Sequence, residues 1–172
     1  MNRKPKKPSL AETHPELVKQ WHPSKNSNLT PEDFVSGSGK KVWWYCDKGD
    51  DHIWEKRIVD QSEVNKCPYC NNRKLSITNS LKTKFPEIAQ QWHPIKNQNL
   101  KPSDVIFSSG KKVWWKCSKA EGHEWQTTVE KRTSGRKCPF CSGSKPDKKN
   151  NLKSARPLLA KEWHPTKNGK LK

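Results

Sequence analysis

The sequence predicts two small α+β units in tandem, followed by the front end of a third. Two observations predict this arrangement. Residues 80–141 repeat residues 9–70 at a constant offset of 71, without a gap, and 29 of the 62 aligned positions are identical. Only 30% of the 172 residues are hydrophobic, although nine are Trp, so the chain cannot fill one large core. A third copy begins near Asn151 and occupies residues 151–172. The remaining segments are then a basic N-terminal arm (1–8), a linker (71–79) and a basic linker (142–150).

Each repeat is predicted to begin with a short helix and to continue into a β-hairpin. In "THPELVKQWHP" Pro15 falls in the first helical turn, where its missing N–H costs nothing. Leu17 and Trp21 are four residues apart and share one face of that helix. The string "LTPEDF" predicts a second turn or helical stub. The string "SGSG" (36–39) is typical of a turn. After it, "KKVWWYC" (40–46) predicts a strand, and "HIWEKRIV" (52–59) predicts the returning strand.

All six cysteines lie in the repeated frame, and one histidine of each repeat shares that frame. Three thiolates and one imidazole at this spacing, closed by a C-P-x-C turn, are typical of a tetrahedral Zn²⁺ site. Four protein ligands leave no coordination position open, so each site is predicted to be structural. The sequence therefore predicts two zinc ions per chain. The candidate ligands are Cys46, His52, Cys67, Cys70, Cys117, His123, Cys138 and Cys141.

Other interpretations of the cysteines fit less well. Three cysteines per repeat cannot all pair internally as disulfides, and free buried cysteines would not recur with a histidine at fixed spacing. Iron favours softer, usually all-sulfur ligation. His22 and His93 also recur and are the alternative fourth ligands. They precede the first cysteine of their repeat by 24 residues, so we interpret them as packing or capping residues.

The paired tryptophans of "KVWWYC" and "KVWWKC" point to opposite faces of their strand. One ring is expected in the core, because a repeat with few aliphatic side chains needs large aromatic ones and a metal to fold. Two interpretations of the outward ring stay open. Either Trp21 or the adjoining repeat covers it, or it is a stacking platform for a nucleic-acid base.

The net charge of +18 is unevenly distributed. Residues 9–70 carry eight Lys/Arg against ten Asp/Glu, a net −2, whereas residues 80–141 carry twelve against five, a net +7. Residues 142–172 add nine against two, again +7. This asymmetry predicts a phosphate-binding surface in the C-terminal half. The candidate nucleic-acid contacts are Lys111, Lys112, Arg132, Arg136 and Lys137.

Enzymatic motifs are missing from the sequence: it contains no Gly-rich phosphate loop, G-x-S-x-G or H-E-x-x-H. We therefore expect a non-catalytic, monomeric zinc protein that binds nucleic acid, DNA rather than RNA, mainly through the second repeat and the basic tail. The alternative is a protein-interaction adaptor with structural zinc sites. No apolar run is long enough to span a membrane, and the basic N-terminus is not a secretory signal. A cytoplasmic location without a membrane partner is expected.

The combined motif also resembles a known family. The strings S-L-x(4)-P-E-[LI]-x(3)-W-H-P-x-K-N, V-W-W-x-C-x(5)-H-x-W and C-P-[YF]-C are similar to those of bacterial and phage domains described as zinc ribbons or treble clefs. These domains are often in tandem and often lie beside endonuclease domains. The resemblance implies zinc binding and nucleic-acid recognition, at the nucleoid of a bacterium or in the host cytoplasm of a phage. The family's Arg and Gly before the last C-P-x-C match Arg132 and Gly135, whereas the first repeat has Gln61 and Val64.

Overall fold

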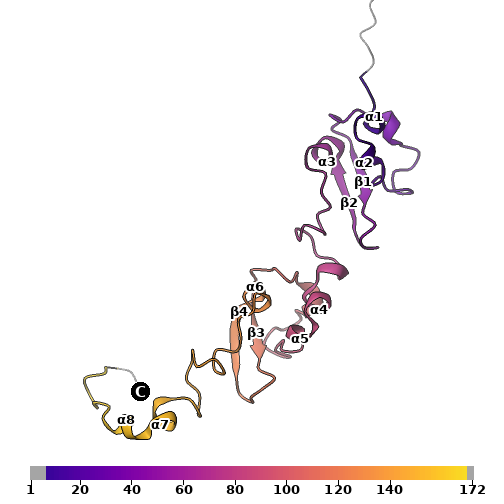
Figure 1. Cartoon of the computed structure of the whole chain (residues 1–172). Helices are drawn as coiled ribbons and strands as arrows, with labels where there is room; N and C mark the ends of the chain where they lie inside the picture. Colours follow the sequence, from indigo (N-terminus) through magenta and orange to yellow (C-terminus); the bar gives the residue numbers. More distant parts are fainter. Residues whose placement is uncertain (1–6, 170–172) are drawn as a thin grey trace, which may run out of the picture. The chain divides into compact units, whose positions relative to one another are not determined.

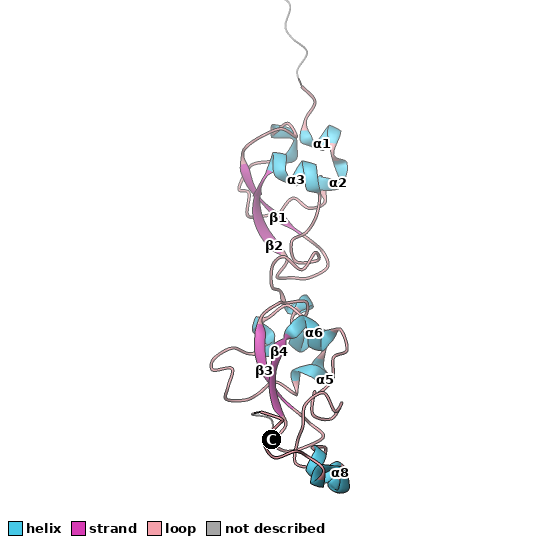
Figure 2. Ribbon diagram, turned by 90° about the vertical axis from the view of Figure 1, so that its left-hand side faces the viewer, coloured by secondary structure: helices cyan, strands magenta, loops and turns pink. Residues whose placement is uncertain are grey.

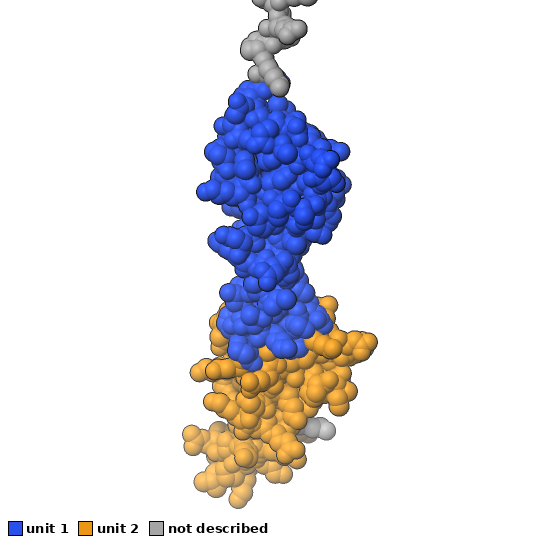
Figure 3. Space-filling model, turned by 90° about the vertical axis from the view of Figure 1, so that its right-hand side faces the viewer, with its two compact units in different colours: residues 1–86, 102–108 blue, residues 87–101, 109–172 orange. Residues whose placement is uncertain are grey.

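The computed structural model describes residues 7–169, which divide into two compact units (Figure 3). Compact unit 1 extends to Pro86 and includes Pro102–Ser108. Compact unit 2 comprises Glu87–Lys101 and the described residues from Ser109 onward. The division falls inside the second sequence repeat, and each zinc-ligand set lies within one unit.

The first repeat opens with two short helices rather than one. Ser9 caps α1 through a capping box with Glu12, and Pro15 stands at the first turn of α2, as predicted. His14 separates the two helices because its φ of −139° and ψ of 64° are not helical. The three-residue 3₁₀ helix η1 corresponds to the predicted second turn or helical stub. The elements of this repeat are α1 (Leu10–Thr13), α2 (Pro15–Val18), η1 (Pro31–Asp33), β1 (Lys41–Tyr45), β2 (Ile53–Arg57) and α3 (Ile58–Val64) (Figure 1).

The β1–β2 hairpin contributes one side of the hydrophobic core of the first repeat. The two strands lie side by side (Figure 2) and pair antiparallel, with Trp44 opposite Trp54. Trp44 is fully buried, its ring meets that of Trp21 edge-on at 5.5 Å, and its indole N–H donates to the Lys56 carbonyl at 3.1 Å. Tryptophan burial therefore replaces the missing aliphatic residues. The core consists of Leu10, Leu17, Trp21, Val42, Trp44, Trp54, Ile58 and Cys67.

The predicted returning strand is too long. Strand β2 ends at Arg57, and α3 begins at Ile58 instead of continuing the strand to residue 59. Ile58 and Gln61 are both fully buried, and their spacing of three places them on one helical face. Asn65 then ends α3 in the left-handed conformation, with φ 38°. In the second repeat the strand likewise ends at Thr128, whose side chain caps the next helix by accepting from the Lys131 N–H.

The second repeat has the same order of elements. Its hairpin places Trp115 opposite Trp125. Equivalent core positions are buried again: Leu81, Val113, Trp115, Trp125, Val129 and Cys138. The elements are α4 (Leu81–Lys84), α5 (Pro86–Ala89), η3 (Pro102–Asp104), β3 (Lys112–Lys116), β4 (Glu124–Thr128) and α6 (Val129–Thr133), and η2 (Ile77–Asn79) lies in the linker before them.

The predicted front end of a third repeat forms the same pair of helices. These are α7 (Leu152–Ala155) and α8 (Pro157–Lys161), with Asn151 capping α7. No helix among residues 7–169 is long and apolar enough to cross a membrane.

Candidate metal centres

Each repeat brings its three cysteines and one histidine together in a four-ligand cluster. The first ligand follows the outgoing strand, the histidine precedes the returning strand, and the C-P-x-C turn follows the helix. In each set the ligand atoms all lie within 4.8 Å of one another. The two sets are those predicted from the sequence: Cys46, His52, Cys67 and Cys70, and Cys117, His123, Cys138 and Cys141.

The distances between ligand atoms fit a tetrahedral zinc ion. With Zn–S near 2.3 Å and Zn–N near 2.0–2.1 Å, tetrahedral angles require about 3.8 Å between two sulfurs and about 3.6 Å between sulfur and nitrogen. In the first site Cys46 Sγ lies 3.7 Å from Cys70 Sγ, and the latter lies 3.6 Å from His52 Nδ1. Such sulfur separations are far too long for a disulfide, whose S–S bond is about 2.05 Å.

The second site has nearly the same dimensions. Cys117 Sγ lies 3.7 Å from Cys141 Sγ. His123 Nδ1 lies 3.5 Å from Cys141 Sγ and 3.7 Å from Cys138 Sγ. Both histidines thus offer Nδ1 to the metal, which leaves Nε2 to carry the proton and donate a hydrogen bond.

The hairpin backbone fixes the first two ligands of each set. The Cys46 N–H donates to the His52 carbonyl at 3.1 Å, and the Cys117 N–H donates to the His123 carbonyl at 2.9 Å. An aromatic ring from the C-P-x-C turn stacks on each histidine. Tyr69 lies 5.0 Å from the His52 ring.

Without a metal the clustered thiols hold their protons unequally. Burial, together with the neighbouring thiols, raises the pKa of Cys70 to about 12. The hydrogen bond that the Cys141 thiol makes to Cys117, with burial, raises the pKa of Cys141 to about 11. Burial also acts on Cys117, but hydrogen bonds from the Lys119 N–H, the Cys141 thiol, the Ala120 N–H and the Cys138 thiol together outweigh it and lower the Cys117 pKa to about 7. Zinc binding therefore releases protons from these sites.

The metal-binding histidines have different second partners in the two repeats. His52 Nε2 donates to the hydroxyls of Ser76, at 3.1 Å, and Thr78, at 2.8 Å. His123 Nε2 instead donates to a carboxylate, Asp147 Oδ2, at 2.8 Å. A hydrogen-bond acceptor at Nε2 fixes the orientation of the imidazole ring and raises the basicity of the histidine as a metal ligand.

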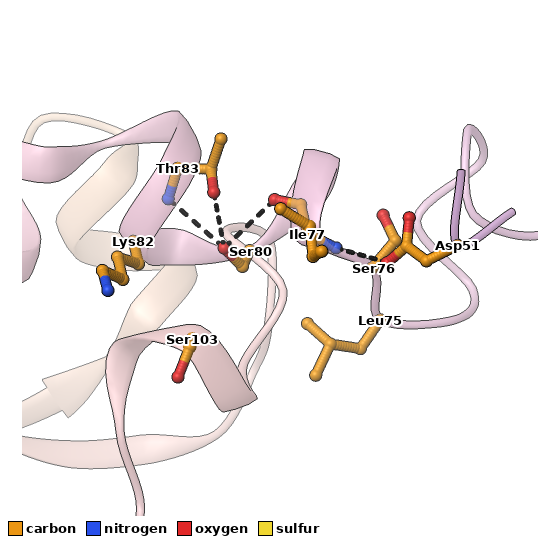
Figure 4. Close-up of a pocket in the computed structure, with 8 residues that line it drawn as sticks. All are labelled: Asp51, Leu75, Ser76, Ile77, Ser80, Lys82, Thr83 and Ser103. Atoms are coloured by element: carbon orange, nitrogen blue, oxygen red, sulfur yellow. Dashed lines mark hydrogen bonds between the residues drawn. The ribbon is translucent and has the colours of Figure 1, made fainter. Parts of the chain in front are cut away.

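Sequence reasoning missed these partners because they lie in the segments 71–79 and 142–150. The signal was present, since the offset of 71 continues through both segments and aligns Ser76 with Asp147 and Asn79 with Asn150. Asn79 donates to the Tyr69 carbonyl at 2.8 Å, as Asn150 does to the Phe140 carbonyl. In compact unit 1 the Ile77 N–H also donates to Asp51 Oδ2 at 2.7 Å (Figure 4). Both segments therefore pack on the metal centres.

The family model described as a probable treble-clef zinc finger domain matches this chain twice, at residues 17–73 and 88–144. The chain belongs to this family. The two matches are themselves 71 residues apart, in register with the two treble-clef ligand sets. A search of curated proteins gave no match.

The alternative ligands His22 and His93 are structural in this treble-clef protein. Both are buried. His93 Nδ1 accepts the backbone N–H groups of Ile95 and Lys96, at 3.2 and 3.1 Å, and His22 accepts two backbone N–H groups in the same way. The capping interpretation is confirmed.

Arg132 is a core residue, which corrects its assignment as a phosphate contact. Its side chain is only 6% exposed, and its guanidinium lies over the rings of Trp115, at 5.5 Å, and Trp125, at 5.6 Å. It donates to Gln91 Oε1 at 2.8 Å and to the Arg136 carbonyl. Burial lowers the pKa of Arg132. Sequence-based charge counting cannot reveal this burial.

The other four predicted cations are on the surface. Lys111 and Lys112 lie at the start of β3, and Arg136 and Lys137 lie directly before Cys138. All four side chains are exposed. Gly135, just ahead of Arg136, has a φ of 94°, which favours glycine there.

Proposed function

We propose that this treble-clef protein is a non-catalytic, monomeric module that binds nucleic acid, DNA in preference to RNA, through the second repeat and the basic segment after it. The observation that carries the proposal is the exposed basic pair Arg136 and Lys137 at the second metal centre. The corresponding residues of the first repeat are Asn65 and Lys66.

The backbone that presents this pair is held in place. The Arg136 N–H donates to the Lys131 carbonyl at 3.1 Å, the Arg136 carbonyl accepts from Arg132, and Cys138 belongs to the zinc ligand set. Cations on such a fixed turn are presented to phosphates with little further ordering. Buried Arg132 thus supports a surface that it does not itself join.

The metal sites support a non-catalytic role. A zinc ion held by three thiolates and one imidazole has four protein ligands, so no position is open for a substrate or water. The zinc would fix the hairpin, the turn and the basic residues between them.

Two matched triple variants test the proposal. Lys111, Lys112 and Lys137 occupy the same frame positions as Lys40, Lys41 and Lys66, and all six are exposed. Changing the first set to Ala should flatten the log–log salt dependence of duplex binding by about two to three units, since each neutralised phosphate contributes about 0.9. The second set should have a smaller effect. Equal losses in a gel-shift titration at several salt concentrations would contradict the asymmetry.

A protein-docking role is the second candidate, and one feature of compact unit 1 favours it. Leu75 and Ile77 are exposed, Ile77 by 73%, and line an open hollow of about 620 Å³ together with Asp51 and Lys82 (Figure 4). An apolar docking surface responds little to salt. Salt-independent binding to a protein, with no nucleic-acid binding, would favour this candidate.

A further inference from the structure

The outward tryptophan of the second repeat stands in a basic environment. Because side chains alternate along a strand, Trp115 faces the core, while Trp114 shares the opposite face with Lys112 and Lys116. Both lysines are exposed, and Trp114 is half-buried. The lysine α-carbons are about 13 Å apart on either side of the indole, at about 3.3 Å per residue.

A third lysine lies on the ring itself. Lys96 Nζ is 4.6 Å from the centroid of the Trp114 ring and pairs with the Glu124 carboxylate. One ammonium group thus lies over the half-buried indole and pairs with one carboxylate, and two further exposed lysines share the strand face with the ring. The Trp92 ring packs edge-on at 5.5 Å against Trp115, the tryptophan that faces the core.

The backbone of Trp114 is also fixed. Its N–H donates to Asn97 Oδ1 at 2.8 Å. Its carbonyl accepts from Asn97 Nδ2 at 2.8 Å and from the His93 N–H at 3.1 Å. These bonds join the strand to the "WHPIKN" segment on both sides of the indole, so the ring is positioned before any ligand arrives.

We infer that Trp114 is a stacking platform for an unpaired base of single-stranded DNA. The base replaces the Lys96 ammonium on the ring, because base stacking is a stronger contact than a cation–π contact with a solvent-exposed ammonium such as that of Lys96. Lys96, Lys112 and Lys116 then neutralise the phosphates on either side of that base. The bases of a duplex are paired and stacked on each other, so they cannot reach the indole. This inference rests on the proposed nucleic-acid function and specifies its ligand.

The first repeat keeps the platform but changes its surroundings. Lys25 lies 5.0 Å from the Trp43 ring centroid, as Lys96 does at Trp114. Tyr45 replaces Lys116, and exposed Glu55 stands opposite Trp43 where Gln126 stands opposite Trp114. Ile53 stands where Glu124 does, so the surroundings of Trp43 have one lysine fewer and the same number of acids. This ring should therefore contribute less, which makes Trp43 the matched control.

The test uses the full zinc-loaded chain with Trp114→Leu and Trp43→Leu. The probes are an oligothymidine of about 16 nucleotides, the upper end of the site size of one small binding fold, and its duplex with oligoadenosine. Trp114→Leu should weaken single-strand binding about 5- to 150-fold and leave duplex binding unchanged. Trp114→Phe, which keeps a ring, should restore most of the affinity. Trp43→Leu should have little effect on either probe.

Several outcomes would overturn the inference. Equal loss on both probes, or equal loss with Trp114→Phe, would show that Trp114 acts only through the fold. A loss with Trp43→Leu as large as with Trp114→Leu would remove the asymmetry. Tenfold tighter binding of oligouridine than of oligothymidine would overturn the choice of DNA. If wild type binds both probes but Trp114→Leu changes neither, the platform fails and the proposed function stands. If wild type binds no probe, both fail. Zinc content and circular dichroism control for folding.

Discussion

Replacing Asp147 with Ser should loosen zinc at the second metal centre and leave the first centre unchanged. Asp147 Oδ2 accepts the His123 Nε2 proton at 2.8 Å, whereas the first centre uses the Ser76 and Thr78 hydroxyls. A carboxylate strengthens the donor bond to the ring and makes Nδ1 a better zinc ligand. The variant gives the second site the hydroxyl that the first site already has.

The expected size follows from this internal comparison. Loss of an outer partner of a metal-binding histidine costs about 10- to 100-fold in metal affinity. Serine keeps an acceptor near His123, so Asp147→Ser should cost about tenfold, and Asp147→Ala should cost closer to a hundredfold. The Asp147 carboxylate also accepts the Asn150 and Lys149 N–H groups, which hold its pKa below the usual range together with His123. It is therefore ionised at neutral pH.

Chelator competition on the fully loaded chain measures the effect. Half of the bound zinc should leave the variant at about tenfold lower chelator concentration than it leaves wild type, while the other half is unchanged. Asn150→Ala is the control, because Asn150 holds the same turn through the Phe140 carbonyl at 2.8 Å without contacting His123. If Asn150→Ala releases zinc as readily as Asp147→Ser, or if both halves of the zinc shift together, the carboxylate argument is refuted.

Three further predictions concern metal content and the core. The folded chain should contain two zinc ions, and their removal should unfold both repeats in circular dichroism, because the binding energy of such sites is folding energy; fewer than two ions in a fully folded chain would contradict this. Arg132→Ala should lower the free energy of unfolding, measured by urea denaturation, by about 2 kcal/mol, because the charged hydrogen bonds of Arg132 are lost. Arg132→Gln should lower it by less, because Gln61 fills the equivalent buried position in the first repeat. Equal losses for the two variants would contradict this comparison. Asn97→Ala should lower the free energy of unfolding by about 2 kcal/mol, because it removes two hydrogen bonds to the Trp114 backbone. Asn26→Ala should lower it by the same amount, since Asn26 makes the same hydrogen bonds to Trp43. A clear difference between the two losses would contradict the equivalence of the two asparagines.

The ligand sets were predictable because residue type alone identifies them. Cysteine and histidine are uncommon here, and their recurrence at fixed spacing indicates a shared ion. Helix α3 was harder, because Ile58 and Val59 favour a strand locally and only the burial of Gln61 reveals the helical face. Tertiary packing decided that segment.

The roles of Ser76, Asp147 and Arg132 required coordinates for a different reason. Ser76 and Asp147 have different chemistry but share one task, accepting a hydrogen bond from a ligand histidine, so residue identity conceals their equivalence. Arg132 has the charge of a surface residue, yet the two indoles and the Gln91 amide provide a buried place for it. Such roles depend on neighbours that are distant in the sequence.

The helices of the third-repeat fragment form from local sequence, whereas the burial of the same helices in the first repeat depends on the β-hairpin. Arg156, between α7 and α8, has φ −143° and ψ 68°, close to the values of −139° and 64° at His14. The helix pair therefore forms from its own caps and prolines. Its apolar face differs: Leu159 is 53% exposed and Trp163 is 42% exposed, while their counterparts Leu17 and Trp21 are 0% and 9% exposed. In the first repeat the Trp44 indole packs against Trp21 and closes this face. The local sequence thus determines the helices, and packing against the hairpin with the paired tryptophans buries their apolar face in a core.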